Sequence, residues 1–374
     1  MAGIIEEQHA ERCRLFMQWK KMDWPILVDS LNRLEVTAIP ITLLIDEWGI
    51  VRKVQARPAD LEEFLRQDFA QPEGYAVPNS TKPDLSRLPQ KPESALSEEA
   101  IGVALYEWGG MQRIDECIER FGRSVAMDPG NASALFRLGV AHRRRYESEY
   151  RRTEDFQQAV RYWGKALSID PNQYIWRRRI QQYGPRLDKP YSFYDWVRQA
   201  RAEIQDRGEH PVPLTVEPNG AEFALPLKQD VARETGEVQP DAQGRITRDE
   251  RPLIRAEYTV VPATTGARPL FRVHVVFQPD DAFKAHWNNE ADAMAFWIDP
   301  PQGWTVDAQR HDWPNPPSPV SREARRAEFE FKGPVEARGD TVTIRGYALY
   351  SVCEEVDGMC LYRRQDLILR VSAQ

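Results

Sequence analysis

Two of the four cysteines stand close together near the C-terminus, at Cys353 and Cys360, and this pair is the first candidate for chemistry. Asp357-Gly358 lies between them, and Asp-Gly flanked by strand residues is a strong signal for a β-hairpin. Across such a turn two Cα atoms come within the roughly 5.5–6 Å that a disulfide needs. A small, exposed disulfide ring is of the labile kind that exchanges with thiols. A permanent structural disulfide, or two buried thiols that never pair, fits the same spacing.

A metal site is not predicted at the cysteine pair. Two thiolates would need two further ligands to hold a zinc ion. The histidines in this part of the chain are scattered without ligand spacing, at His274, His286 and His311. We therefore predict neither a metal nor a cofactor.

The other two cysteines are predicted to be structural. Cys13 shares a helical face with Phe16 and Met17, and this spacing favours a buried thiol. Cys117 occupies a small-residue position in a predicted helix, where a core thiol is expected. The pair at 353 and 360 is therefore the candidate redox centre of the chain.

The bulk composition is that of a globular protein with two or three domains. The 374 residues carry a net charge of −7, which argues against a nucleic-acid partner. The arginine runs 143–145 and 177–179 fall within predicted helices, and we expect solvated helix faces there. No stretch approaches the roughly 18 apolar residues of a membrane span. The N-terminus lacks the basic and apolar regions of a secretory signal, which favours the cytoplasm if Met1 is the true start.

Residues 206–374 have the alternating pattern of β-strands. Apolar and polar residues alternate in segments that Pro, Gly and Asp clusters separate. The clearest segments are 271–277, 327–332, 341–350 and 367–371. An all-β sandwich is the expected architecture.

Tryptophan and proline motifs precede the cysteine pair in a fixed order, with Trp304 and Trp313 in the two most specific blocks. The series resembles the N-terminal, extracytoplasmic domain of the thiol:disulfide interchange protein DsbD and its relatives, over residues 255–372. The resemblance implies an immunoglobulin-like sandwich whose two cysteines pass electrons between a membrane partner and thioredoxin-like proteins. It assigns the mixed disulfide to Cys360 and the resolving role to Cys353. It also implies a loop that shields the pair, for which residues 313–317 are the candidate, with Trp313 at the substrate.

Residues 97–205 are predicted to be helical and to contain an internal repeat. The segments that end at Pro129 and Pro171 are similar, and the two prolines stand 42 residues apart. This distance is the tetratricopeptide period of about 34 plus an insertion of about eight residues. The region resembles tetratricopeptide repeats, with about two repeats and a capping helix around 191–205. The resemblance implies docking of a protein partner. Residues 71–96 are rich in proline and are predicted to be a linker.

Residues 1–70 alternate helix and strand signals, and a helix is expected to begin at Pro58. The stretch 24–52 resembles the second half of a thioredoxin-like redoxin domain. The resemblance gives Pro40 the place of the family's cis-proline, next to the active site and the substrate. An ordinary proline at the start of a strand fits that position as well.

The redox cysteine of thioredoxin-like domains precedes the part that is matched here. Either the gene product starts earlier, with the missing half and a signal peptide, or the segment is a non-catalytic remnant. We expect the first, which restores an extracytoplasmic location where disulfide traffic is at home.

The sequence thus predicts a multidomain α+β protein with a partial thioredoxin-like unit, a tetratricopeptide array and a β-sandwich. The predicted function is thiol–disulfide exchange on protein thiols, with Cys353 and Cys360 as the working pair. Whether this chain alone is an enzyme stays open. The alternative is a non-catalytic scaffold or binding protein with a static Cys353–Cys360 disulfide.

Overall fold

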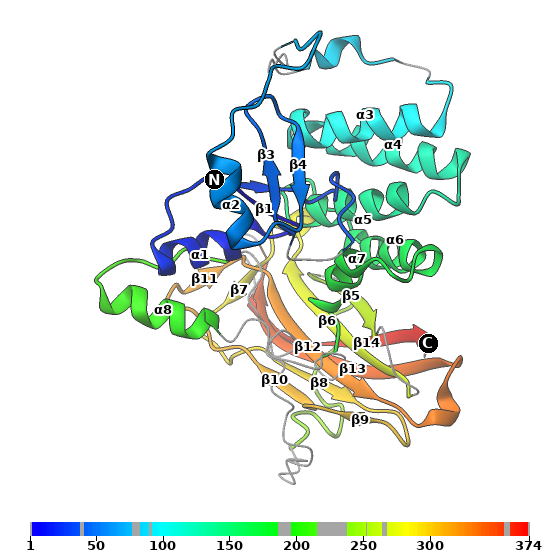
Figure 1. Ribbon diagram of the computed structural model, residues 1–374. Coiled ribbons are helices and arrows are strands. Elements are labelled where there is room, and N and C mark those ends of the chain that lie inside the picture. The colour runs from blue at the N-terminus through cyan, green and yellow to red at the C-terminus, as the bar shows by residue number, and fades with distance from the viewer. Residues whose placement is uncertain are drawn as a thin grey trace.

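The computed structural model describes residues 2–37, 41–76, 83–89, 92–185, 196–214, 238–251, 253–263, 268–354 and 360–372. The chain is a mixed α and β protein, as predicted. Figure 1 shows an N-terminal unit of small sheets and helices, a stack of helices beside it and a β-sandwich below both.

The N-terminal unit contains two small, separate sheets. Strands β1 (Gly3–Ile5) and β2 (Ile26–Val28) pair in parallel, and α1 (Ala10–Lys20) connects them. Strands β3 (Leu43–Ile45) and β4 (Val51–Val54) form an antiparallel hairpin. Helix α2 (Pro58–Leu65) follows and begins at the predicted proline.

Five helices form the stack. They are α3 (Ala95–Trp108), α4 (Ile114–Met127), α5 (Ala132–Tyr146), α6 (Asp155–Ile169) and α7 (Tyr174–Gln181). Side chains cap two of the N-termini: Ser94 accepts from the amide of Ser97, and Asn131 from that of Ala134. The short 3-10 turns η1 (Leu85–Arg87) and η2 (Met111–Arg113) precede α3 and α4.

Glycine allows a close helix contact in the stack. A Cβ atom on Gly139 of α5 would lie 2.6 Å from the indole of Trp163 and 3.0 Å from the carbonyl oxygen of Ala159. We expect Gly139→Ala to destabilise the protein by about 1–3 kcal/mol through overpacking. Gly122→Ala in α4 is the matched control, because nothing lies within 4 Å of its added Cβ. It should stabilise the protein by about 0.5–1 kcal/mol through helix propensity. Urea unfolding of both variants measures the two changes in stability. If Gly139→Ala and Gly122→Ala change the stability in the same direction, the assigned packing is contradicted.

Helix α8 (Trp196–Asp206) packs on α1, whereas the sequence predicted a cap on the helical repeats. The indoles of Trp19 and Trp196 stack with centroids 6.0 Å apart, and Trp19 Nε1 donates to Glu203 at 2.6 Å. The apolar face of α8 shares one small core with Leu15 and Trp19. The apolar face of α1 thus packs against α8, which completes the core of the N-terminal unit (Figure 1).

Two antiparallel sheets pack face to face as a sandwich. The four-stranded sheet contains β5 (Ile254–Pro262), β6 (Leu270–Pro279), β12 (Arg325–Lys332) and β9 (Thr305–Val306), in that order. The six-stranded sheet contains β7 (His286–Asn288), β8 (Ala295–Asp299), β10 (Arg310–Asp312), β11 (Val320–Ser321), β13 (Thr341–Cys353) and β14 (Cys360–Ser372). Residues from the inner faces of both sheets form one core, because alternate residues of each strand point inward.

The helical stack contacts both other parts of the chain. Leu31 of the N-terminal unit is buried in the core of the stack, and Arg137 donates to its carbonyl oxygen at 3.2 Å. The amide of Tyr174 donates to the carbonyl oxygen of Thr37 at 3.2 Å. On the other side Val261 of β5 is buried in the same core. Part of the surface that the sequence predicted for a protein partner is therefore occupied by this chain. Among the described residues, no helix is both long and apolar enough to cross a membrane.

Candidate redox site

Cys353 and Cys360 form a disulfide that joins the end of β13 to the start of β14. The two residues are directly opposite in the ladder between these long strands, and their Cα atoms are 4.0 Å apart. The sequence predicted the two arms of a hairpin at these positions. The Asp357-Gly358 turn between them lies outside the described residues.

Backbone hydrogen bonds show which way the residues of β14 face. The amide of Arg364 donates to the carbonyl of Thr247 at 3.0 Å, and its carbonyl accepts from the amide of Asp249 at 2.8 Å. The backbone N–H and C=O groups of Arg364 thus point away from β13. Because this direction alternates along an antiparallel strand, the backbone groups of Cys360 and Tyr362 also point away from β13. The two cysteines therefore form a non-hydrogen-bonded pair, in agreement with their short Cα distance.

The disulfide lies on the outer face of the six-stranded sheet. Tyr350 and Val352 belong to the sandwich core, so alternation places Cys353, and Cys360 opposite it, on the other face. Cys353 is only 3% exposed, whereas Cys360 is exposed. A thiolate from solvent therefore reaches the Cys360 sulfur more readily than the Cys353 sulfur.

The covered side of the disulfide faces strand β7. His286 is paired with Cys353 in the ladder, so these residues and Cys360 form one row across three strands. Glu354 follows Cys353 directly and is ion-paired with Arg251, whose Nη1 donates to it at 3.2 Å. Among the described residues, Glu354 is therefore the charged residue that lies nearest to Cys353 along the chain.

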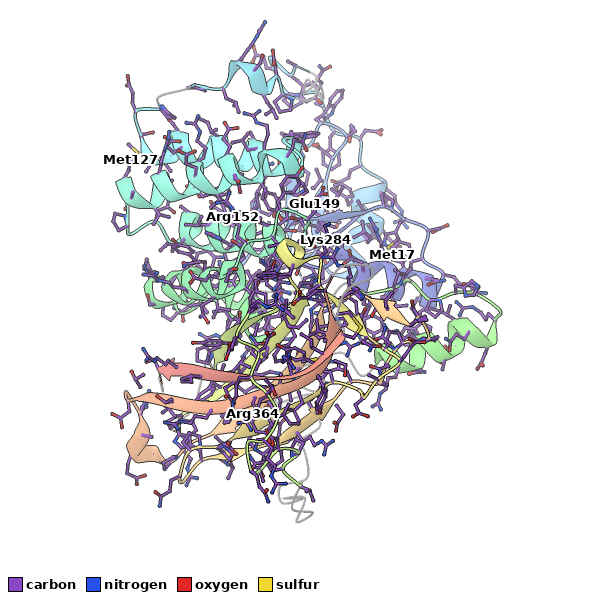
Figure 2. All side chains as sticks on the ribbon, turned by 180° about the vertical axis from the view of Figure 1, so that it is seen from behind. Met17, Met127, Glu149, Arg152, Lys284 and Arg364 are labelled. Atoms are coloured by element: carbon purple, nitrogen blue, oxygen red, sulfur yellow. A yellow bond between two sulfur atoms is a disulfide. The ribbon has the colours of Figure 1, made fainter. Side chains whose placement is uncertain are left out.

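A second group of side chains covers the outer face beside the disulfide. Trp297, Tyr347 and Leu349 are buried there under Ile246. Arg364, labelled in Figure 2, lies with its guanidinium 3.7 Å from the centre of the Tyr347 ring and is paired with Asp241 at 2.8 Å. Burial, with Asp292 and Asp241 nearby, raises the pKa of Tyr362. The segment that contains Asp241 and Ile246 thus shapes the surface next to the cysteines.

Trp313 packs into the sandwich. Its ring contacts those of His311 and Phe277, with centroids 4.3 and 5.9 Å away, and its Nε1 donates to the carbonyl of Arg326 at 3.1 Å. Asn315 donates to the carbonyl oxygens of Asn289 and Ala291 at 3.0 and 2.8 Å. The Asn315 contacts tie this segment to the loop that follows β7. The structure thus brings Cys353 and Cys360 together, gives Trp313 other neighbours and leaves Pro40 outside the described residues.

The two free cysteines are poorly suited to thiolate chemistry. Cys117 is fully buried, its Sγ lies 3.3 Å from the carbonyl oxygen of Gly102, and burial raises the pKa of its thiol to about 12. Cys13 is half-buried, and burial together with Glu7 raises its pKa. A raised pKa lowers the thiolate fraction at neutral pH, and the thiolate is the nucleophile.

The arginine runs are not solvated helix faces, in contrast to the prediction. Arg143, Arg145 and Arg179 are buried, with exposed fractions of 4%, 6% and 2%. Arg143 Nε donates to Glu147 at 2.6 Å, and Arg145 Nη2 lies 2.5 Å from Asp155. These arginines tolerate burial because carboxylates and aromatic rings surround them.

A buried group of side chains that the sequence did not reveal joins the N-terminal unit to the helical stack, and His274 of β6 reaches it from the sandwich, with its Nε2 2.8 Å from the carbonyl oxygen of Tyr183. We call His9, Arg12, Arg143, Glu147 and Tyr183 the junction cluster. His9 Nε2 lies 2.6 Å from the hydroxyl of Tyr183 and 3.4 Å from Glu147. Burial, with Arg143 and Arg12 nearby, lowers the pKa of His9 well below its usual value. The histidine is therefore neutral at pH 7.

Glu6 lies beside the junction cluster, at the end of β1. Both of its carboxylate oxygens are buried, and burial together with the Asp29 charge raises its pKa to about 8. Arg179 offsets part of this shift. Glu6 and Asp29 follow neighbouring parallel strands, whose carboxyl ends meet at one edge. An acidic residue directly after each of two short apolar strands is the only signal in the sequence for the Glu6–Asp29 site.

Within the described residues, no three His, Cys, Asp or Glu side chains gather as a metal site would require.

Comparisons with known proteins do not assign a family. No family model matches the chain, and no curated protein matches it. Similar solved structures include the GAE domain of GGA2p from Saccharomyces cerevisiae, at 10% identity and a TM-score of 0.21 over 34% of this chain and 96% of that one. The GAE domain of yeast GGA1 is similar at 13% identity and a TM-score of 0.20, over 34% of this chain and 98% of that one. Similarity at this level carries no argument about function.

Proposed function

We propose that the chain is a thiol–disulfide exchange protein and that Cys353 and Cys360 are its working pair. The observation that carries this proposal is the disulfide between two strand ends with one exposed and one covered cysteine. An accessible disulfide sulfur is the part of such a bond that a thiolate attacks. The substrate class is protein thiols.

The exchange proceeds in two steps. A substrate thiolate forms a bond to the Sγ of Cys360, the Cys353–Cys360 bond breaks, and the electron pair leaves with the Cys353 sulfur, which takes up a proton. A second substrate thiolate then attacks the substrate sulfur of the mixed disulfide and releases Cys360. The substrate dithiol is oxidised to a disulfide, and the pair is reduced to two thiols. The reverse sequence reduces a substrate disulfide.

The proposal includes the finer domain assignments. Residues 1–70 are a partial thioredoxin-like unit, the helices α3 to α7 within residues 97–205 are tetratricopeptide repeats, and residues 206–374 are a DsbD-like, immunoglobulin-like sandwich. The parallel β1–β2 pair with its connecting helix, the paired helices of the stack and the two packed antiparallel sheets support these assignments. Thioredoxin-like or other thiol proteins are the proposed partners. The disulfide favours an extracytoplasmic location, because oxidising compartments preserve such bonds.

The reduction potential of the pair tests the proposal. We expect a value above about −300 mV, because a structural disulfide that resists cellular thiols lies below that. We also expect Cys353→Ser to retain the exposed Cys360 thiol, which attacks the disulfide of an oxidised partner such as thioredoxin in its disulfide form and is trapped as a mixed disulfide. Cys13→Ser is the control and should leave the potential unchanged. A potential below about −300 mV together with no trapped species from Cys353→Ser or Cys360→Ser would refute exchange.

That negative result would favour a scaffold protein with a static disulfide. The junction cluster supports this second function, because it fixes the N-terminal unit, the helical stack and the sandwich to one another. In that case the helical stack and the N-terminal unit serve only recognition.

A further inference from the structure

In the part of the chain that the structure describes, the outer edge of β14 has backbone groups without a hydrogen-bond partner beside the exposed cysteine. The N–H and C=O groups of Cys360 and Tyr362 point away from β13, as the hydrogen bonds of Arg364 establish. Among the described residues, backbone pairing on this edge occurs at Arg364, where the segment 247–249 lies parallel to the strand. The edge is therefore able to pair with an extended chain, and it does so within this molecule next to the redox site.

We propose that β14 binds the substrate by β-strand addition at Cys360 and Tyr362, with an extended, cysteine-containing segment of a thiol protein as the added strand. This inference rests on the proposed exchange function and specifies how the substrate is held. Main-chain hydrogen bonds at a sheet edge give affinity that does not depend on side-chain identity. The substrate class is therefore defined by an extended backbone and a cysteine at one register position.

The register brings the backbone of the substrate cysteine to a Cα separation from Cys360 that disulfides span. In an added antiparallel strand, a substrate residue directly opposite Cys360 forms a hydrogen-bonded pair with it, for which the Cα atoms are about 5.5 Å apart. This separation is at the preferred value for a disulfide. Side chains of directly opposite residues lie on the same face of a sheet, so a substrate cysteine here shares the outer face with Cys360.

The same register also gives the direction of attack. Cys353 and Cys360 lie side by side across the ladder, so the open edge is on the side of Cys360 that faces away from Cys353. A thiolate attacks a disulfide sulfur along the extension of the bond that breaks. An added strand therefore aligns three sulfurs in one row, with the substrate sulfur as attacking group, Cys360 Sγ in the centre and Cys353 Sγ as leaving group. The bond that forms and the bond that breaks are those of the exchange described above.

Synthetic peptides test strand addition without altering the protein. The oxidised full chain is mixed with a reduced, single-cysteine peptide of β-forming sequence, and mixed-disulfide formation is followed by acid quenching and mass spectrometry. N-methylation of the peptide's cysteine removes the N–H that would donate to the Cys360 carbonyl, and we expect it to slow the reaction about fivefold to tenfold. N-methylation of the following residue is the matched control, because that N–H points away from β14. It should leave the rate within about twofold.

A protein variant provides the second test. Tyr362→Pro removes an outward N–H that the β13–β14 ladder does not use, and proline is tolerated at such an edge position. We expect it to slow capture of the unmodified peptide severalfold while reduction by dithiothreitol stays within about twofold. Ile368→Pro, at another exposed and outward-facing position of β14, is the control and should change neither rate.

The outcomes separate this inference from the proposed function. Equal rates for the two N-methylated peptides, together with normal capture by Tyr362→Pro, would overturn strand addition while exchange itself stands. If neither the unmodified peptide nor dithiothreitol reduces the pair, the exchange function fails and strand addition fails with it. A slower reaction for the cysteine N-methyl peptide alone supports the proposal.

Discussion

Arg143→Ala is expected to destabilise the protein by about 3–5 kcal/mol, because it removes the centre of the junction cluster. The guanidinium lies 4.1 Å from the ring centre of Phe156 and 4.4 Å from that of Tyr183. It also holds the Glu147 carboxylate, whose own burial raises its pKa. Alanine leaves that carboxylate without its arginine in a buried place and opens a void between the rings. Urea unfolding measures the loss.

Two further variants make this result specific. Arg161→Ala replaces an exposed arginine of α6 and should change stability by no more than about 0.5 kcal/mol. Adding Glu147→Gln to Arg143→Ala removes the stranded charge, so the double variant should recover about 1–2 kcal/mol of the loss. A double variant no more stable than Arg143→Ala would show that the void, and not the charge, causes the destabilisation.

The position of the disulfide could be predicted from sequence because its cause is local. Cys353 and Cys360 flank a turn signal, and a hairpin places its two arms opposite each other whatever the rest of the chain does. The helix starts at Ser94 and Asn131 have equally local causes, since a capping side chain acts within three residues. Features of this kind require no knowledge of tertiary contacts.

The junction cluster could not be predicted because its partners come from distant parts of the chain. Arg143 has the sequence context of an exposed helix arginine, and its burial follows from rings supplied by α6 and by Tyr183. Helix α8 likewise has an apolar face whose partner the sequence does not specify, and in the structure that face packs on α1 beside Trp19. The sequence pattern gives each face, whereas the partner of that face is set by tertiary packing.

Glu6 gives the junction a pH dependence whose sign follows from its pKa. Folding raises this pKa from 4.5 to about 8, so between these values the folded chain keeps a proton that the unfolded chain releases. The stabilisation from Glu6 is therefore complete below pH about 4.5 and is lost as the pH rises through about 8. Glutamine cannot ionise and imitates the protonated carboxyl. At pH 9 we expect Glu6→Gln to be about 2 kcal/mol more stable than the unchanged chain, less than the full shift implies because the residue is partly exposed.

Urea unfolding at pH 5 and pH 9 measures this difference, which should fall to near zero at the lower pH. His9 titrates in both chains and so cancels in the comparison. Glu62→Gln on α2 is the matched control, because its side chain is 78% exposed and the substitution is chemically the same. The effect of Glu62→Gln on stability should be the same at pH 5 and at pH 9. An equal effect of Glu6→Gln at both pH values would mean that the carboxyl does not hold its proton in the folded chain. Any loss of stability at alkaline pH would then arise from groups outside the ends of β1 and β2.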